Sequence, residues 1–204
     1  MFRSGLATMF ATMFATGLAA TFSGMPLWAE VSIRAPDRAR LETADATFGT
    51  ALRAALAEGA PADVAVLVEA LAGAPGPVAP AGDWNCRVLK LGGLLPLTVY
   101  TDFRCRIVVV EPGIWELEKL TGSQRVAGRI HQEDGAATFL GVGYVTGGPA
   151  ADYQGLPPLD QTPVEPGQTT ANVGFFEQMG PDRARLLFPQ PLLESEFDIL
   201  YLTR

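Results

Sequence analysis

The chain has 204 residues, of which 48% are hydrophobic and 18% are charged, which suits a globular domain with a buried core and excludes wholesale disorder. The 22 acidic residues outnumber the 15 lysines and arginines, for a formal net charge of -7. A nucleic-acid partner is therefore excluded, because such binding depends on neutralising phosphates. With one His and two Cys, the chain lacks the side chains of a His- or Cys-rich metal centre, and we expect no metal and no cofactor.

The N-terminal segment has the layout of a secretory signal. Arg3 is the only charged residue before Glu30, and the run between them is largely apolar and reaches a small residue at Ala29. A positive start, an apolar centre and a small residue at the cleavage point are typical of exported proteins. We predict a signal peptide over 1–29, a periplasmic location, and no stable transmembrane span after cleavage. Cleavage near Ala20 and a retained membrane anchor are the alternatives.

Residues 30–75 are predicted to form a helical hairpin. Apolar side chains recur at three- and four-residue steps from Pro36 until Gly59, and again from Pro61 until Gly73, which is the period of amphipathic helices. The expected apolar stripes are Leu41, Phe48, Leu52 and Leu56 in the first helix, and Val64, Leu67, Val68 and Leu71 in the second. The Pro-rich residues 74–81 read as a linker.

From residue 82 onward the hydrophobic period changes to two. The predicted strands are 84–91, 98–110, 114–120, 125–131, 138–146, 172–178, 183–188 and 197–202. Because a long antiparallel sheet usually closes on itself, we predict a mainly β fold: a small antiparallel β-barrel of about eight strands over 82–204. The alternative is a β-sandwich. Gly141 and Gly143, at same-face positions of one strand, indicate a sharp bend or a close backbone approach.

Cys86 and Cys105 lie on consecutive predicted strands, where an exported protein would form a disulfide. If they lie directly opposite each other, Trp84 pairs with Ile107 on the same apolar face. The arginines of both strands then share the other face. We predict the disulfide, with two buried thiols as the alternative.

Residues suited to catalysis are scarce. His131, the only imidazole, sits beside a predicted turn and is expected to be solvated. The pairs Glu116 with Glu118 and Glu194 with Glu196 have the same-face spacing of a glycosidase-like dyad. The first pair alternates with apolar residues as an ordinary solvated face does. We assign no catalytic residue and predict that the protein is not an enzyme; chemistry built on these carboxylates with arginine is the distant alternative.

The candidate binding residues fall into three groups. The first is the polar loop Thr121, Ser123, Gln124 and Arg125, which is either a binding tip or a self-satisfied turn. The second is Arg87 and Arg104 on the outer face of the first hairpin, which is either an anion site or a set of screened pairs with neighbouring aspartates. The third is Tyr153 in the Pro-rich connection 147–170, which would cover a barrel mouth, bind a partner as an extended segment, or be disordered.

Several stretches resemble an uncharacterised bacterial exported family, known as domain of unknown function 4893. They are Gly82-Asp83-Trp84-Asn85-Cys86-Arg87, Lys90-Leu91-Gly92-Gly93-Leu94, Phe103-Arg104-Cys105-Arg106-Ile107 and Leu117-Glu118-Lys119-Leu120-Thr121-Gly122-Ser123-Gln124-Arg125. The resemblance implies export and places both cysteines in the family motif, but implies no activity. A much weaker likeness links Gly82-Asp83-Trp84 to lipocalin and protease-inhibitor barrels. Those families favour an arginine that packs on the tryptophan, and Arg204 is judged too terminal for that role.

These features predict an exported, non-enzymatic binding module that recognises a small ligand or a protein partner. The alternative is an envelope structural or assembly factor that docks through its N-terminal helices.

Overall fold

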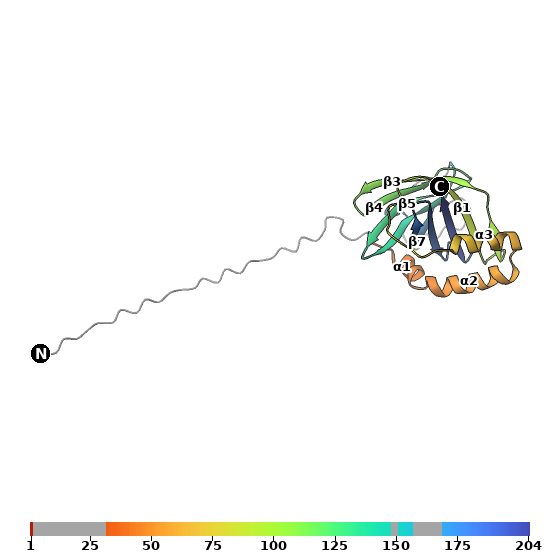
Figure 1. Ribbon diagram of the computed structural model, residues 1–204, viewed down its shortest axis with the longest axis horizontal. Coiled ribbons are helices and arrows are strands. Elements are labelled where there is room, and N and C mark those ends of the chain that lie inside the picture. Colours follow the sequence, from red (N-terminus) through yellow and green to blue (C-terminus); the bar gives the residue numbers. More distant parts are fainter. Residues whose placement is uncertain (2–31, 148–150, 157–168) are drawn as a thin grey trace. The chain divides into compact units, whose positions relative to one another are not determined.

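The computed structural model describes residue 1 and residues 32–147, 151–156 and 169–204 (Figure 1). The predicted signal peptide lies outside the described residues, apart from Met1, as does most of the Pro-rich connection 147–170. Residues Ile33–Arg204 form one compact unit.

Three helices precede nine strands in the described part of the chain. The helices are α1 (Ala35–Glu42), α2 (Ala44–Glu58) and α3 (Pro61–Leu71). The strands are β1 (Gly82–Leu91), β2 (Leu97–Val99), β3 (Phe103–Glu111), β4 (Ile114–Lys119), β5 (Gln124–Glu133), β6 (Ala136–Val145), β7 (Thr170–Gly180), β8 (Arg183–Pro189) and β9 (Phe197–Thr203). The predicted helical hairpin is thus three helices, because the first predicted helix is interrupted at Thr43.

The strands form one antiparallel sheet that closes into a barrel. Each strand from β3 to β9 pairs with its neighbour in sequence, and β1 pairs with both β3 and β9 to close the ring. The short β2 is an extra strand that pairs with the last residues of β1. The predicted barrel is confirmed and the β-sandwich is wrong, since closure gives a single continuous sheet.

Alternate side chains of the eight strands that form the ring, β1 and β3–β9, point into the barrel interior, as the period of two requires. Phe139 and Phe188 meet edge to face there, with ring centroids 5.6 Å apart. A Cβ atom at Gly141 would lie 2.4 Å from the backbone oxygen of Ala127 on the neighbouring strand, so the close backbone approach predicted at this glycine is confirmed. The buried core includes Trp84, Cys86, Cys105, Ile107, Trp115, Leu117, Ile130, Phe139, Phe176, Leu186, Phe188, Leu200 and Leu202.

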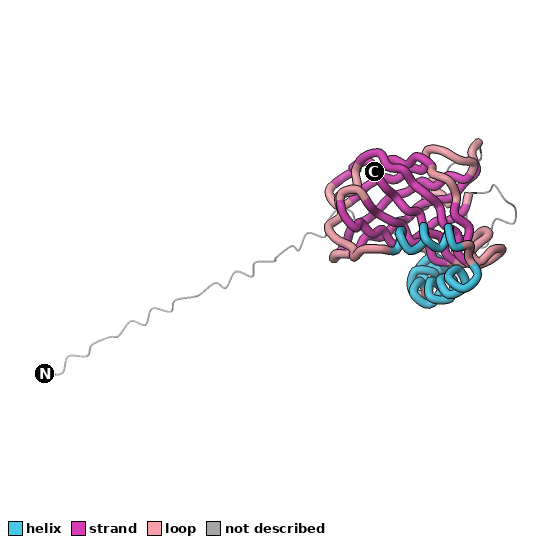
Figure 2. The backbone as a smooth tube through the Cα atoms, turned by 45° about the vertical axis from the view of Figure 1, so that its right-hand side comes forward, coloured by secondary structure: helices cyan, strands magenta, loops and turns pink. Residues whose placement is uncertain are grey.

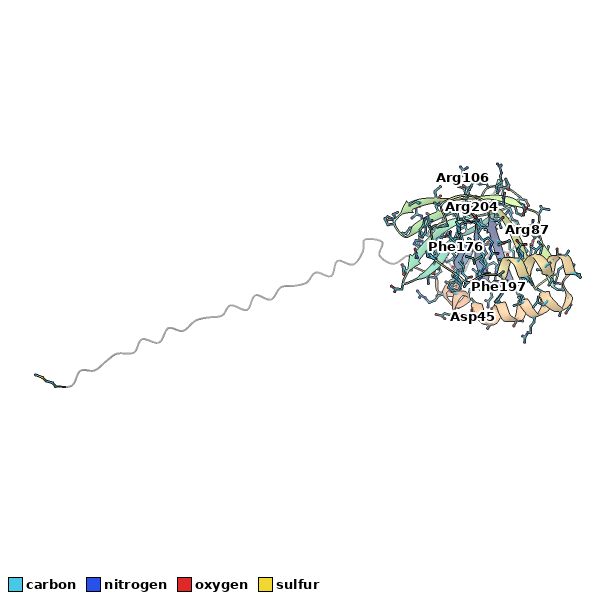
Figure 3. All side chains as sticks on the ribbon, viewed as in Figure 1. Asp45, Arg87, Arg106, Phe176, Phe197 and Arg204 are labelled. Carbon is cyan, nitrogen blue, oxygen red and sulfur yellow. A yellow bond between two sulfur atoms is a disulfide. The ribbon has the colours of Figure 1, made fainter. Side chains whose placement is uncertain are left out.

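A second apolar core lies between the helices and the outer wall of the barrel, and Figure 2 shows the helices together on one side of the strands. Phe197 of β9, labelled in Figure 3, packs against Phe48 of α2 with ring centroids 4.9 Å apart. The predicted stripes are partly wrong, because Leu56 and Val68 are 50% and 56% exposed. Their expected places against the wall are taken by small side chains, since Ala51, Ala55 and Ala70 are fully buried.

The disulfide joins Cys86 and Cys105, whose Cα atoms are 5.9 Å apart, but the predicted register is wrong by two residues. Cys105 lies opposite Trp84, and Cys86 lies opposite Phe103. A shift of two leaves every side chain on its predicted face. The slip arises because the prediction placed the two cysteines directly opposite each other, whereas the disulfide joins diagonal positions of β1 and β3.

One end of the barrel is closed by the chain itself. The segment 74–81, predicted as a linker, crosses this end: Gly76 N donates to Gln178 O at 2.8 Å, and Val78 packs on the interior core. Trp84 Nε1 donates to Pro80 O at 2.7 Å. Contrary to our expectation, the Arg204 guanidinium stacks 3.9 Å from the Trp84 ring centroid.

Candidate functional site

A cavity of about 320 Å³ opens at the other end of the barrel. The alternating course of the strands brings to this end the connections after β1, β4, β6 and β8. The floor of the cavity is apolar, because it is the top layer of the barrel interior: Val88, Phe103, Val126, Phe188 and Leu200.

The walls of the cavity become polar at the mouth. Along several strands, the last side chain that points into the barrel is polar, whereas those before it are apolar. Two residues beyond inward Val88 lies Lys90, and two beyond Leu117 lies Lys119. In the same way Asp198 precedes inward Leu200 by two residues. Strand alternation therefore turns these charged side chains into the barrel, and all three line the cavity.

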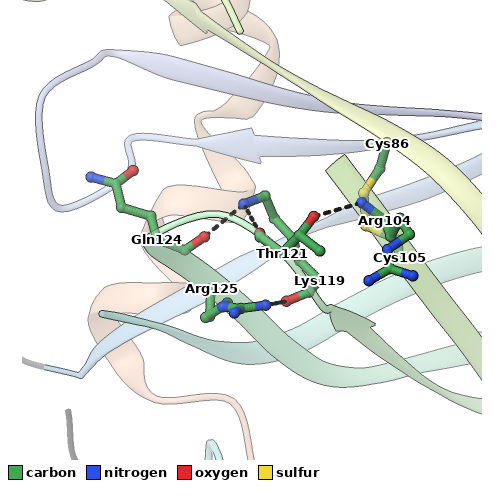
Figure 4. Close-up of a disulfide and its surroundings, with 7 residues drawn as sticks. All are labelled: Cys86, Arg104, Cys105, Lys119, Thr121, Gln124 and Arg125. Carbon is green, nitrogen blue, oxygen red and sulfur yellow. Dashed lines mark hydrogen bonds between the residues drawn. A yellow bond between two sulfur atoms is a disulfide. The ribbon is translucent and has the colours of Figure 1, made fainter. Parts of the chain in front are cut away.

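Lys119 is the most deeply buried cation at the mouth, with 2% of the residue exposed. Its Nζ donates to Thr121 O at 2.8 Å and to Gln124 O at 2.7 Å (Figure 4). The ammonium also lies 3.6 Å from the centroid of the Phe103 ring. Burial, reinforced by the positive charges of Arg125 and Lys90, lowers the pKa of Lys119 to about 8.

Lys90 is also buried but has an acidic partner. Its ammonium forms an ion pair with Glu194 and a 3.3 Å hydrogen bond to Gln124 Oε1. The hydrogen bond from Lys90 lowers the pKa of the Glu194 carboxyl. Lys90 and Glu194 therefore neutralise each other across the mouth.

Asp198 supplies a half-buried carboxyl to the cavity wall. Burial raises the pKa of Asp198 to about 6, although Ser195 Oγ donates a 2.5 Å hydrogen bond to its Oδ1. Near neutral pH this group changes charge readily, so the mouth contains both a proton-sensitive acid and a proton-sensitive base.

The polar loop identified in the sequence borders this cavity. Ser123, Gln124 and Arg125 line it, and Arg125 donates to Thr146 Oγ1 at 3.0 Å and to Lys119 O at 3.3 Å. The Thr121 hydroxyl instead accepts a 2.9 Å hydrogen bond from the Arg104 backbone. The loop is thus hydrogen-bonded within itself and also forms part of the cavity wall.

The other candidate residues lie elsewhere. The Tyr153 hydroxyl is buried against α1, where it donates to Asp37 Oδ2 at 2.8 Å and accepts from Arg34 N at 3.1 Å. Arg87 and Asp102 form an ion pair at 2.7 Å on the outer face. Arg104 lines a small hollow beside the first strand pair, outside the barrel mouth.

The residues weighed for catalysis do not meet at one place. Glu116, Glu118, Glu194 and Glu196 are all exposed. His131 is half-buried rather than solvated as predicted, because it lies within β5, and burial lowers its pKa.

Lys90, Lys119 and Asp198 were missed as site residues. The sequence signal that identifies them is a charged residue two positions away from an apolar residue that points into the barrel, because alternate residues of a strand share a face. Among the described residues, no cluster of three or more His, Cys, Asp or Glu side chains has the arrangement of a metal site. Within the same residues, each helix is too short or too polar to cross a bilayer.

Comparison with known proteins identifies the family to which the chain belongs. The family described as Domain of unknown function (DUF4893) has a model that matches residues 28–202. No curated protein and no solved structure matches the chain.

Proposed function

Because the chain belongs to the DUF4893 family, whose function is unknown, we propose its function from the barrel: a non-enzymatic module that binds a small, largely apolar ligand in the mouth cavity. The observation that carries this proposal is an apolar floor beneath a polar mouth. At about 320 Å³ the cavity is at the lower end of small-molecule sites. A water molecule takes about 30 Å³ of liquid, so the space suits roughly ten non-hydrogen atoms.

Packing elsewhere in the barrel supports a ligand rather than an incidental void. Trp84 and Phe139 are buried at 3% and 0% exposure, as in an ordinary close-packed interior. At the mouth, by contrast, Phe103 and Val126 are only partly buried although they border the core. An apolar ligand covering them would gain about 25 cal/mol for each Å² removed from water.

We propose further that residues 1–29 are a signal peptide and that the protein acts in the periplasm. The Cys86–Cys105 disulfide supports this location, because disulfides persist in oxidising compartments. The Trp84–Arg204 stack at the closed end supports the likeness to lipocalin-type barrels.

The test is to fill the cavity from within. Val126→Trp places a large ring in the cavity, whereas Val108→Trp makes the same change on the outer face of β3, where Val108 is 45% exposed. We expect 1-octanol, followed by isothermal titration calorimetry, to bind the unmodified protein and Val108→Trp but to bind Val126→Trp at least about tenfold more weakly. Equal binding to both variants, or no saturable binding to the unmodified protein, would refute the proposal.

A second candidate function is docking to an envelope partner through the helices. The observation that favours it is the exposure of two large apolar side chains, Leu56 and Val68. Deleting the helices would not test it cleanly, because Leu67 shares a core with Leu89 of the barrel wall. The double variant Leu56→Ser, Val68→Ser leaves that core intact and should abolish co-purification of a partner if the helices dock it.

A further inference from the structure

The positive charge of Lys119 has no negative partner in the described part of the chain. Its two hydrogen-bond acceptors are backbone carbonyls, and the charges that act on it most, Arg125 and Lys90, are both positive. Lys90 is balanced by Glu194. Arg125 donates to a hydroxyl and to a carbonyl and forms no ion pair with a described carboxylate.

An uncompensated buried ammonium is unusual, because removing a charge from water is unfavourable unless an opposite charge accompanies it. An ammonium has three N–H donors, and two of those of Lys119 are used by Thr121 O and Gln124 O. The third N–H of Lys119 remains for a ligand. Lys119 lines the cavity, and its ammonium lies over the face of the Phe103 ring.

We propose that the mouth cavity selects a small apolar monocarboxylate, whose tail lies on the apolar floor and whose carboxylate pairs with the Lys119 ammonium next to Arg125. This inference rests on the proposed function and adds the charge of the ligand. The carboxylate would supply the counter-charge that Lys119 lacks, and Arg125 would strengthen the attraction from the same wall. The space of about 320 Å³ suits a chain of roughly eight carbons, such as octanoate.

The charges around the mouth also predict how pH affects binding. Lys119, with its pKa of about 8, loses its charge as the pH rises above that value. Asp198, with its pKa of about 6, gains a negative charge as the pH rises through that value. Glu194 and Lys90 form an ion pair, and Arg125 lines the same cavity. As the pH rises, the loss of positive charge at Lys119 and the gain of negative charge at Asp198 both weaken the binding of an anion. A neutral ligand has no net charge for these groups to attract or repel, so its binding should depend little on pH.

The experiment compares octanoate with 1-octanol on the disulfide-bonded protein by isothermal titration calorimetry at about pH 7. A charge-assisted hydrogen bond in a buried site predicts that octanoate binds about tenfold or more tightly than 1-octanol. Lys119→Met keeps the aliphatic stem and should remove this difference. Arg129→Met removes an exposed cation from the outer face of β5 and should preserve it.

Each outcome has a definite meaning. Equal binding of octanoate and 1-octanol, or tighter binding of octylamine, would overturn the inference while leaving the proposed function intact. Absence of saturable binding for all three would overturn the proposed function itself. If Lys119→Met does not fold, the pH profile of the unmodified protein still decides: octanoate binding should weaken severalfold from about pH 7 to about pH 9.5 and 1-octanol binding should not.

Discussion

Removing the carboxyl group of Asp37 should strongly destabilise the protein, because it leaves a buried arginine without its counter-charge. Asp37 and Arg40 form an ion pair at 3.0 Å on α1, with side chains only 4% and 6% exposed. Arg40 also donates to Pro189 O at 3.2 Å and to Ala171 O at 3.1 Å. The pair therefore joins α1 to the barrel wall.

The expected magnitude follows from the burial of the pair. Removing one partner of a buried ion pair costs about 3–5 kcal/mol, which is a large part of the 5–15 kcal/mol that stabilises a typical domain. The Nη2 atom of Arg40 is buried and has no hydrogen-bond partner among the described residues, so the pair is not ideally satisfied even now. Replacing both residues, as in Asp37→Ala with Arg40→Met, should therefore restore stability to within about 1–2 kcal/mol of the unmodified protein.

The measurement is a double-mutant cycle by urea unfolding with the disulfide intact. Asp37→Ala alone should lower the free energy of unfolding by about 3–5 kcal/mol, and adding Arg40→Met should recover most of the loss. The reasoning fails if Asp37→Ala costs less than about 1 kcal/mol, or if the two substitutions simply add.

Three further predictions concern the barrel. Replacing Cys86 and Cys105 by serine should lower the free energy of unfolding by about 3 kcal/mol, because it opens a loop with a sequence separation of 19; an unchanged urea midpoint would contradict this. Because burial raises the pKa of Asp198 from 3.8 to about 6, the folded state binds this proton more tightly, and the contribution of Asp198 to stability should rise as the pH falls from about 6 to about 4. Asp198→Asn should therefore be more stable than the unmodified protein by about 1–3 kcal/mol at pH 7.5, and this difference should shrink as the pH falls to about 4. Gly128→Ala should destabilise by about 1–3 kcal/mol or more, since its Cβ would lie 2.4 Å from Gly141 Cα, whereas Gly49→Ala, with open space in a helix, should stabilise slightly in thermal unfolding.

The barrel could be predicted because its information is local and periodic. Alternation decides which face each residue occupies, and this survived even where the pairing was wrong: Trp84 lies opposite Cys105 rather than Ile107, yet all three remain inside. Pairing itself depends on the turn and on the break between β2 and β3, which a hydrophobic pattern does not encode.

The helices show the limit of the same reasoning. The largest apolar residues were expected to face the barrel, but Leu56 faces solvent while Ala51 and Ala55 are fully buried. How closely a helix approaches a wall depends on the shape of that wall, here bearing Leu89 and Phe197. Hydrophobicity alone cannot supply that shape.

The candidate site was only partly accessible from sequence. The polarity of the loop marks Gln124 and Arg125 as candidates. Lys90 and Lys119 carry no such signal, because each is a lysine near the end of a strand, and only the alternation along the whole strand shows that its side chain faces the barrel interior. Tyr153 was grouped with them because it lies in an unusually long connection, yet its hydroxyl serves α1. Contacts so distant in sequence emerge only from the three-dimensional arrangement.

The seam between β1 and β9 has a consequence for the order of folding. It pairs residues that are neighbours in space but lie near the two ends of the barrel sequence: Cys86 lies opposite Leu202, and Leu89 of β1 lies opposite Ile199. The neighbouring hairpins can assemble early in folding, but the ring stays unclosed until β9 pairs with β1. Such long-range pairing is slow to form, so the folding chain exposes an unpaired apolar strand edge, which favours aggregation, until β1 and β9 meet.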